Sequence, residues 1–202
     1  MELLVLGATG ATGRLVVEQA SAAGHTVRAL VRSPRKLDAQ PGLDVVFGRA
    51  TDAGDVTQAM AGIDAVISTL GATGGTVITD ATRAVISGAA TTGVTRFLEL
   101  SSSAVLRERL SGPAEFTSST AMGAMVKDKA AAEDALRASD LDCTLVHSVR
   151  LTNGPATGAA KPLPESATLR MGNTVSRADV ATWMLTALSD TTTTRRSVVI
   201  AG

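Results

Sequence analysis

Three glycines spaced three residues apart, Gly7, Gly10 and Gly13, form the first pattern in the chain that predicts chemistry. They follow an apolar run at residues 3–6 that is short enough for a buried strand, and a stretch of helical period comes after them. In that context the first glycine turns the chain, the second lets a pyrophosphate approach the backbone, and the third lets the helix pack on the sheet. Amide groups of the first helical turn then face the anion. We therefore predict a dinucleotide-binding turn, with a purely structural turn as the alternative, formed by Gly7, Thr9, Gly10, Ala11, Thr12, Gly13 and Arg14.

A basic segment, Arg32-Ser33-Pro34-Arg35-Lys36, follows the second apolar run at residues 26–31. An acidic residue at this position would accept hydrogen bonds from a ribose 2′-hydroxyl, as NAD requires. A guanidinium instead attracts a 2′-phosphate and binds it with a planar fork. Each such charge-assisted hydrogen bond contributes roughly 1.5–3 kcal/mol. The segment therefore predicts NADP(H), with a solvated basic turn as the alternative, and the expected phosphate contacts are Arg32, Ser33, Lys36 and Arg14.

Small or polar residues follow three later apolar runs, at residues 64–68, 95–101 and 141–148. In an open parallel sheet a ligand lies beyond the carboxyl ends of the strands, where the strand order reverses. We expect the nicotinamide ribose to lie against Leu70, Gly71 and Ser101. Ser102 is expected to orient the carboxamide or the acceptor, with a hydrogen bond to backbone at the strand end as its alternative role. His147 is a candidate proton donor, and a structural hydrogen bond is its alternative role.

The elements that must position these residues alternate between strand and helix patterns along the chain. Strand patterns occupy residues 3–6, 26–31, 43–47, 64–68, 95–101, 141–148 and 197–201. After the first helix, further helical patterns occupy residues 55–61, 77–92, 122–138 and 176–188. This alternation predicts a three-layer α/β Rossmann fold, a doubly wound parallel sheet in a single compact domain over residues 1–202. Two stretches without period, at about 103–121 and 151–174, are expected to be loops that form an acceptor pocket.

Composition excludes several other classes of function. Nineteen basic and nineteen acidic residues cancel, so no global field recruits nucleic acid or a charged membrane. No run is long enough to cross a bilayer, and the start of the chain does not resemble a signal peptide. A single cysteine fits a reducing compartment, so we expect a cytoplasmic protein, monomeric or homodimeric, with a small-molecule acceptor. Two histidines and one cysteine without ligand spacing predict no metal site.

Motifs along almost the whole chain resemble those of one protein family. They are the glycine turn, LVRSPRKL, GIDAVISTLG, FLELSSSAV, KAAAEDALRASDLDCTLVHSVRLTNGP and VSRADVATWML. Together they resemble the atypical short-chain dehydrogenase/reductases. The similarity is strongest to the small NAD(P)H-binding group that contains biliverdin reductase B/flavin reductase and the NmrA-like proteins.

The resemblance implies roles for residues after the fifth strand, and it also reveals departures from the family pattern. The usual Tyr-x-x-x-Lys places its lysine, which holds the nicotinamide ribose, at Lys129, and its tyrosine at Met125. The chain has no tyrosine, and a thioether cannot donate a proton. Ser102 matches the family serine near the nicotinamide, whereas the usual Gly-Asp after the third strand is Gly48-Arg49. As an alternative, Lys129 forms only a surface pair with Glu133, one helical turn away.

These observations predict an NADPH-dependent oxidoreductase that transfers hydride to a flat conjugated acceptor such as a flavin or quinone. Proximity and orientation supply much of the barrier reduction in such a reaction, so no general acid is needed. The expected catalytic residues are Ser102, Lys129 and His147, with the proton coming from solvent or from His147. The alternative is a non-catalytic NADP(H)-binding redox sensor of the NmrA type.

Overall fold

A mostly parallel eight-stranded sheet forms the centre of the computed structural model, which describes residues 1–38, 40–111, 121–170 and 172–202. Seven strands run parallel, and the short strand at one edge is antiparallel to its neighbour. The spatial order of the strands is β3 (Leu43–Phe47), β2 (Thr26–Val31), β1 (Glu2–Leu6), β4 (Ala65–Ser68), β5 (Arg96–Ser102), β6 (Asp142–Ser148), β10 (Arg196–Ala201) and β8 (Lys161–Pro162).

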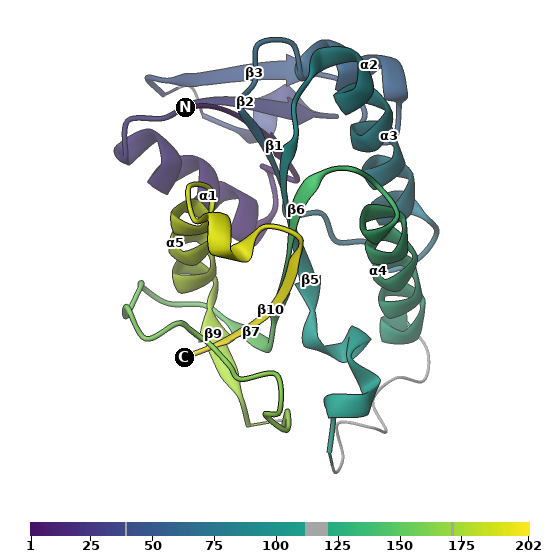
Figure 1. Ribbon diagram of the computed structural model, residues 1–202. Coiled ribbons are helices and arrows are strands. Elements are labelled where there is room, and N and C mark those ends of the chain that lie inside the picture. The colour runs from purple at the N-terminus through teal and green to yellow at the C-terminus, as the bar shows by residue number, and fades with distance from the viewer. Residues whose placement is uncertain (39, 112–120, 171) are drawn as a thin grey trace.

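Helices cover both faces of this sheet (Figure 1). On one face lie α1 (Ala11–Ala22) and α5 (Arg177–Ala187), and on the other lie α2 (Ala53–Ala59), α3 (Val77–Thr92) and α4 (Ala121–Arg137). Strand β1 contributes to both cores because successive side chains of a strand point to opposite faces. Leu3 and Val5 belong to the core under α1 and α5, whereas Leu4 and Leu6 belong to the core under α2 and α3. The predicted doubly wound α/β fold is confirmed.

The strand order reverses at β1, and this reversal decides where a ligand can bind. The chain builds β2 and β3 on one side of β1 and then crosses to place β4 on the other side. After β1 the chain continues into α1 on one face of the sheet, and after β4 it continues into α3 on the other face. The carboxyl ends of these two strands therefore border a crevice, and α1 begins there. Gly7 and Thr69, which follow these two strands, meet there.

The predicted strands and helices are present with shifts of a few residues at their ends. The expected helix at 55–61 begins at Ala53, because the side chain of Asp52 caps it by accepting a hydrogen bond of 2.9 Å from Asp55 N.

The expectation that residues 151–174 form an irregular loop is wrong in part. Strands β7 (Arg150–Thr152) and β9 (Thr174–Ser176) pair in a small second sheet, and β8 pairs with β10. Strands of two or three residues are too short to show a period of two, so no pattern in the sequence predicts them. In the other expected loop, residues 103–111 contain two short 3₁₀ turns, η2 (Ser103–Val105) and η3 (Arg107–Arg109), and residues 112–120 lie outside the described residues.

Within the described ranges, no helix has both the length and the apolar composition needed to cross a bilayer. The same residues hold no group of three or more histidine, cysteine, aspartate or glutamate side chains suited to a metal ion.

Candidate functional site

The glycine turn between β1 and α1 has the geometry that close approach of a ligand requires. Gly7 has φ +82°, in the left-handed region that favours glycine. Gly10 N donates to the Gly7 carbonyl over 2.9 Å, which folds the turn back on itself. A β-carbon on Gly13 would lie 2.1 Å from the Gly7 carbonyl oxygen. Neither Gly7 nor Gly13 can therefore carry a side chain without rebuilding the turn.

The start of α1 leaves its amide groups available to an anion. Gly10 occupies the N-cap without a capping side chain, and the first turn of the helix holds no acidic residue. The first helical amide bonded within α1 is that of Arg14, which donates to Gly10 O over 3.0 Å. The N–H groups of residues 11–13 precede it and lack an acceptor within the helix. This end of α1 suits a phosphate group.

Thr69 holds this turn against β4, a role that is not among the expectations from the sequence. Its hydroxyl lies 3.2 Å from Leu6 O and 3.3 Å from Gly7 O, and it would also meet a β-carbon placed on Gly7. The sequence carried a weak signal for it, since Thr69 is a small polar residue directly after a buried strand.

The basic segment after β2 lies beside α1, to which Lys36 is joined through Arg14. Arg32 and Ser33 are exposed and are followed by a 3₁₀ turn, η1 (Pro34–Lys36). The Arg14 guanidinium donates a hydrogen bond to the carbonyl oxygen of Lys36, which joins the two segments. Four cationic side chains (Arg14, Arg32, Arg35 and Lys36) are therefore exposed within one region at the edge of the glycine turn.

Lys129 lies on α4 with its ammonium at the carboxyl ends of β4 and β5. It is 5% exposed, and Nζ donates to Leu100 O over 2.6 Å and to Leu70 O over 3.3 Å. The alternative of a surface pair with Glu133 is wrong, because Lys129 is buried and its ammonium binds backbone carbonyls. Burial lowers the pKa of Lys129, while nearby Glu99, Glu133 and Asp128 act in the opposite direction.

A glycine turn at a helix start, a basic segment beside it and a buried lysine across the crevice together match a nucleotide site. The family model described as NAD(P)H-binding matches residues 7–191. The chain belongs to the NAD(P)H-binding family. Its cofactor class is therefore NAD(P)H, in agreement with the prediction from the glycine turn.

Solved structures share the fold of this NAD(P)H-binding protein over nearly their full length. The anaerobillin reductase ChuY of Escherichia coli O157:H7 is 27% identical with a TM-score of 0.83, covering 99% of this chain and 96% of its own. A short-chain dehydrogenase/reductase of Veillonella parvula, solved in complex with NADP, is 19% identical with a TM-score of 0.81, covering 100% and 94%.

Curated relatives match only part of the NAD(P)H-binding domain. The photosystem II assembly factor Ycf39 of Synechocystis is 44% identical over 69 residues, which are 33% of this chain and 21% of that protein. The chain thus spans about a fifth of the length of the curated relatives it matches.

The two serines at the end of β5 have different surroundings in the NAD(P)H-binding chain. The Ser101 hydroxyl is buried and donates to Glu133 Oε1, so it faces α4. Ser102 is half-buried, and its Oγ accepts a hydrogen bond of 3.3 Å from Ala104 N, which begins the turn η2. Of the two hydroxyls, that of Ser102 is the more accessible to a ligand.

His147 lies on the α4 face of the sheet, beside Ser101 in the pairing of β5 and β6. Its side chain is completely buried, and Nε2 lies 2.9 Å from Glu133 Oε1. Burial alone would raise the pKa of Glu133, but hydrogen bonds and charges from His147, Ser101 and Arg137 together lower it. This geometry favours the structural role for His147 over proton donation to a ligand.

Asp179, in the first turn of α5, bonds to residues well outside that helix. Its carboxylate accepts hydrogen bonds of 2.8 Å from both Thr157 N and Gly158 N, and bonds to the hydroxyls of Thr157 and Ser176. The residue therefore fastens part of the predicted acceptor segment 151–174 to the body of the domain. The sequence could not reveal this contact because its partners lie more than twenty positions away.

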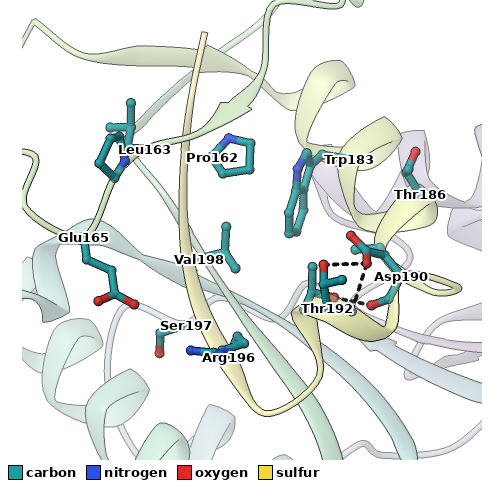
Figure 2. Close-up of a pocket in the computed structure, with 13 residues that line it drawn as sticks. Pro162, Leu163, Glu165, Trp183, Thr186, Asp190, Thr192, Arg196, Ser197 and Val198 are labelled. Atoms are coloured by element: carbon teal, nitrogen blue, oxygen red, sulfur yellow. Dashed lines mark hydrogen bonds between the residues drawn. The ribbon is translucent and has the colours of Figure 1, made fainter.

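A cavity of about 410 Å³ lies at the amino end of β10, between that strand and the second half of α5 (Figure 2). Because β10 runs parallel to β6, its amino end lies where the parallel strands begin, whereas the glycine turn lies where they end. Figure 2 shows Trp183 and Val198 among its lining residues. The cavity is therefore separate from the nucleotide site.

Proposed function

We propose that this protein is an NADPH-dependent reductase that transfers hydride to a flat, conjugated acceptor such as a flavin or quinone. The observation that carries the proposal is the Gly7–Gly13 turn at the start of α1 with the basic segment from Arg32 to Lys36 beside it. The name of ChuY, an anaerobillin reductase that is 27% identical, supports a reductase reaction.

The residues of the chain would hold and orient the cofactor in three places. Amide groups of residues 11–13 would bind the pyrophosphate, and Arg32, Ser33, Lys36 and Arg14 would bind the 2′-phosphate. Lys129 uses two of its three ammonium protons on backbone carbonyls, which leaves one for the nicotinamide ribose. Leu70, Gly71, Ser101 and Ser102 would line the space beside the nicotinamide, with Ser102 orienting the carboxamide or the acceptor. NADPH supplies the hydride when bound.

The source of the proton separates this proposal from the reaction of tyrosine-dependent reductases. Met125, at the position that matches the family tyrosine, is half-buried on α4 and cannot donate a proton. Acceptors that delocalise the incoming electron pair need little acid catalysis by the protein, so solvent is a sufficient proton source. The reduction is then accelerated by proximity and orientation, which can contribute several kcal/mol, on the order of 7–11 at best.

A second candidate function is a redox sensor that binds NADP(H) without turnover. The complete absence of tyrosine from the chain favours it to the same degree as it favours a reductase that uses solvent protons. The two functions differ in whether bound NADPH is consumed.

Oxidation of NADPH by the purified protein, followed with a panel of flavins, quinones, azo dyes and anaerobillin, tests both functions. We expect saturable turnover above the rate of the free acceptor, with a loss of at least tenfold in Lys129→Met. Tight NADPH binding without turnover by any acceptor would support the sensor. Absence of NADPH binding at millimolar concentration in calorimetry would contradict both.

A further inference from the structure

Three buried carboxyl groups lie close enough to Lys129 for their charges to act on it, although among the described residues its ammonium bonds directly only to backbone carbonyls. Glu99 on β5 is completely buried, as is Glu133 on α4, and Asp128 is 5% exposed. The negative charges of all three raise the pKa of Lys129 against the effect of burial, and that of Glu99 has the largest effect of the three. A buried ammonium is costly unless a nearby anion compensates it, so the binding of each carboxyl group decides how much of its charge is left to act on Lys129.

Two of the carboxylates have other partners. Asp128 accepts 2.9 Å hydrogen bonds from Ile78 N and Thr79 N and also bonds to the Thr79 hydroxyl, so it caps the start of α3. Glu133 bonds to Ser101, His147 and Arg137, so its charge is compensated on α4 and β6. The charges of both carboxylates are therefore compensated by hydrogen bonds from other groups.

Glu99 has fewer hydrogen-bond partners than the other two carboxylates. Thr82 on α3 donates to its Oε2 over 3.0 Å, and Oε1 is buried with no hydrogen-bond partner among the described residues. In the sheet, Glu99 lies between Ser68 and Leu145, so its neighbours there carry no charge. An unpaired, fully buried carboxylate oxygen is rare in proteins and calls for an explanation.

We propose that Glu99 is the positioning residue for Lys129, the counter-ion that keeps its ammonium charged and directed at the carboxyl ends of β4 and β5. There the ammonium meets Leu100 O and Leu70 O and offers its remaining proton to the nicotinamide ribose. The second half of this statement rests on the proposed function, because only a bound cofactor places a ribose at that point.

The electrostatics of the pair agree with this arrangement. Burial raises the pKa of Glu99 to about 7, with the charge of Lys129 and the hydrogen bond from Thr82 as the main opposing effects. Loss of Glu99 would therefore lower the pKa of Lys129 further, since its largest favourable charge would be gone. Loss of Lys129 or of the Thr82 hydroxyl would in turn raise the pKa of Glu99.

The first test uses the cofactor-free protein. Carbon-13 NMR of labelled glutamate carboxyls identifies the Glu99 signal by its absence in Glu99→Gln. We expect Lys129→Met to move its titration midpoint upward by about one unit, as loss of a nearby opposite charge does, and Thr82→Val to move it in the same direction. The matched control is Lys127→Met, which removes an exposed lysine from the same helix and leaves the midpoint unchanged. An unchanged midpoint in Lys129→Met, or an equal shift in the control, would overturn the proposal.

The second test measures the dissociation constant of NADPH from pH 6 to pH 9. In Glu99→Gln we expect the loss of affinity to grow as pH rises, from little at pH 6 to roughly tenfold at pH 9, because removal of the carboxylate lowers the pKa of Lys129 further. The affinity of the wild type for NADPH should fall over the same pH range by less than threefold relative to the affinity of Lys127→Met. An equal loss at every pH would indicate a merely structural role and contradict the proposal. If the wild type binds no NADPH, the proposed function fails and the NMR titration alone decides whether Glu99 controls Lys129.

Discussion

A β-carbon on Gly13 would lie 2.1 Å from the carbonyl oxygen of Gly7. Gly7 directly follows β1, whereas Gly13 lies in the first turn of α1. Their contact lets the helix start directly over the end of the strand. The close approach that excludes a side chain is therefore the same feature that aims the start of α1 at a phosphate.

Gly13→Ala should disrupt this contact. The added methyl group meets backbone rather than a flexible side chain, so we expect a loss of about 3 kcal/mol in the free energy of unfolding. For a domain of this size that loss lowers Tm by roughly 6–12 °C. Calorimetry should show NADPH binding reduced at least tenfold at a temperature where the variant is folded. Gly172→Ala is the control, because a β-carbon there meets no atom within 4 Å and the residue has no positive φ. Equal behaviour of the two variants would contradict this account.

The sequence predicts the alternating strands and helices and the glycine turn because these depend on local pattern. It does not predict the burial of the charges on α4, since an exposed pair of Lys129 and Glu133 is one of its two expectations for Lys129. A signal was present, since Val126, Lys129, Glu133 and Leu136 follow each other at steps of three and four residues, which puts all four on one helix face. The structure places that face against the sheet. The short strands β7 and β9 could not be predicted, because only distant pairing defines them.

Arg32→Ala tests the predicted preference for NADP(H). Loss of one charge-assisted contact to the 2′-phosphate should cost about 1.5–3 kcal/mol, or roughly a 10- to 150-fold rise in the dissociation constant of NADPH. The affinity for NADH, which has no 2′-phosphate, should change less than threefold. Arg83→Ala provides the control, because Arg83 is an exposed arginine of α3, on the other face of the sheet from α1. Equal losses for NADPH and NADH in Arg32→Ala would refute the assignment.

Asp179 should make the 153–160 segment sensitive to acid. Burial would raise the pKa of Asp179, but hydrogen bonds from Ser176, Gly158 and Thr157 outweigh burial and lower it. A lowered pKa means that the charged residue stabilises the fold above the ordinary value of 3.8, and that this contribution disappears as pH falls below it.

Asp179→Asn should therefore lose on the order of 2 kcal/mol at pH 7 and approach the wild type at low pH. Thermal unfolding from pH 3 to pH 7 measures the difference, and hydrogen exchange at Thr157 and Gly158 should rise in the variant. The control is Asp134→Asn, in which the replaced carboxylate is 79% exposed and forms only a surface pair with Arg137. A constant difference between Asp179→Asn and wild type across the pH range would argue against this contribution.

His147→Gln separates the two roles weighed for this histidine. Its ring is completely buried against Glu133, so replacement should lower the free energy of unfolding by roughly 1–3 kcal/mol through loss of packing and of the Glu133 contact. If the proton of the reduction comes from solvent, the pH at which turnover declines should remain where it is in the wild type. Measurement of kcat against pH with one fixed acceptor decides the matter. A shift or loss of the wild-type inflection in His147→Gln would assign the proton to His147, because a purely structural residue changes stability without changing which group titrates during turnover.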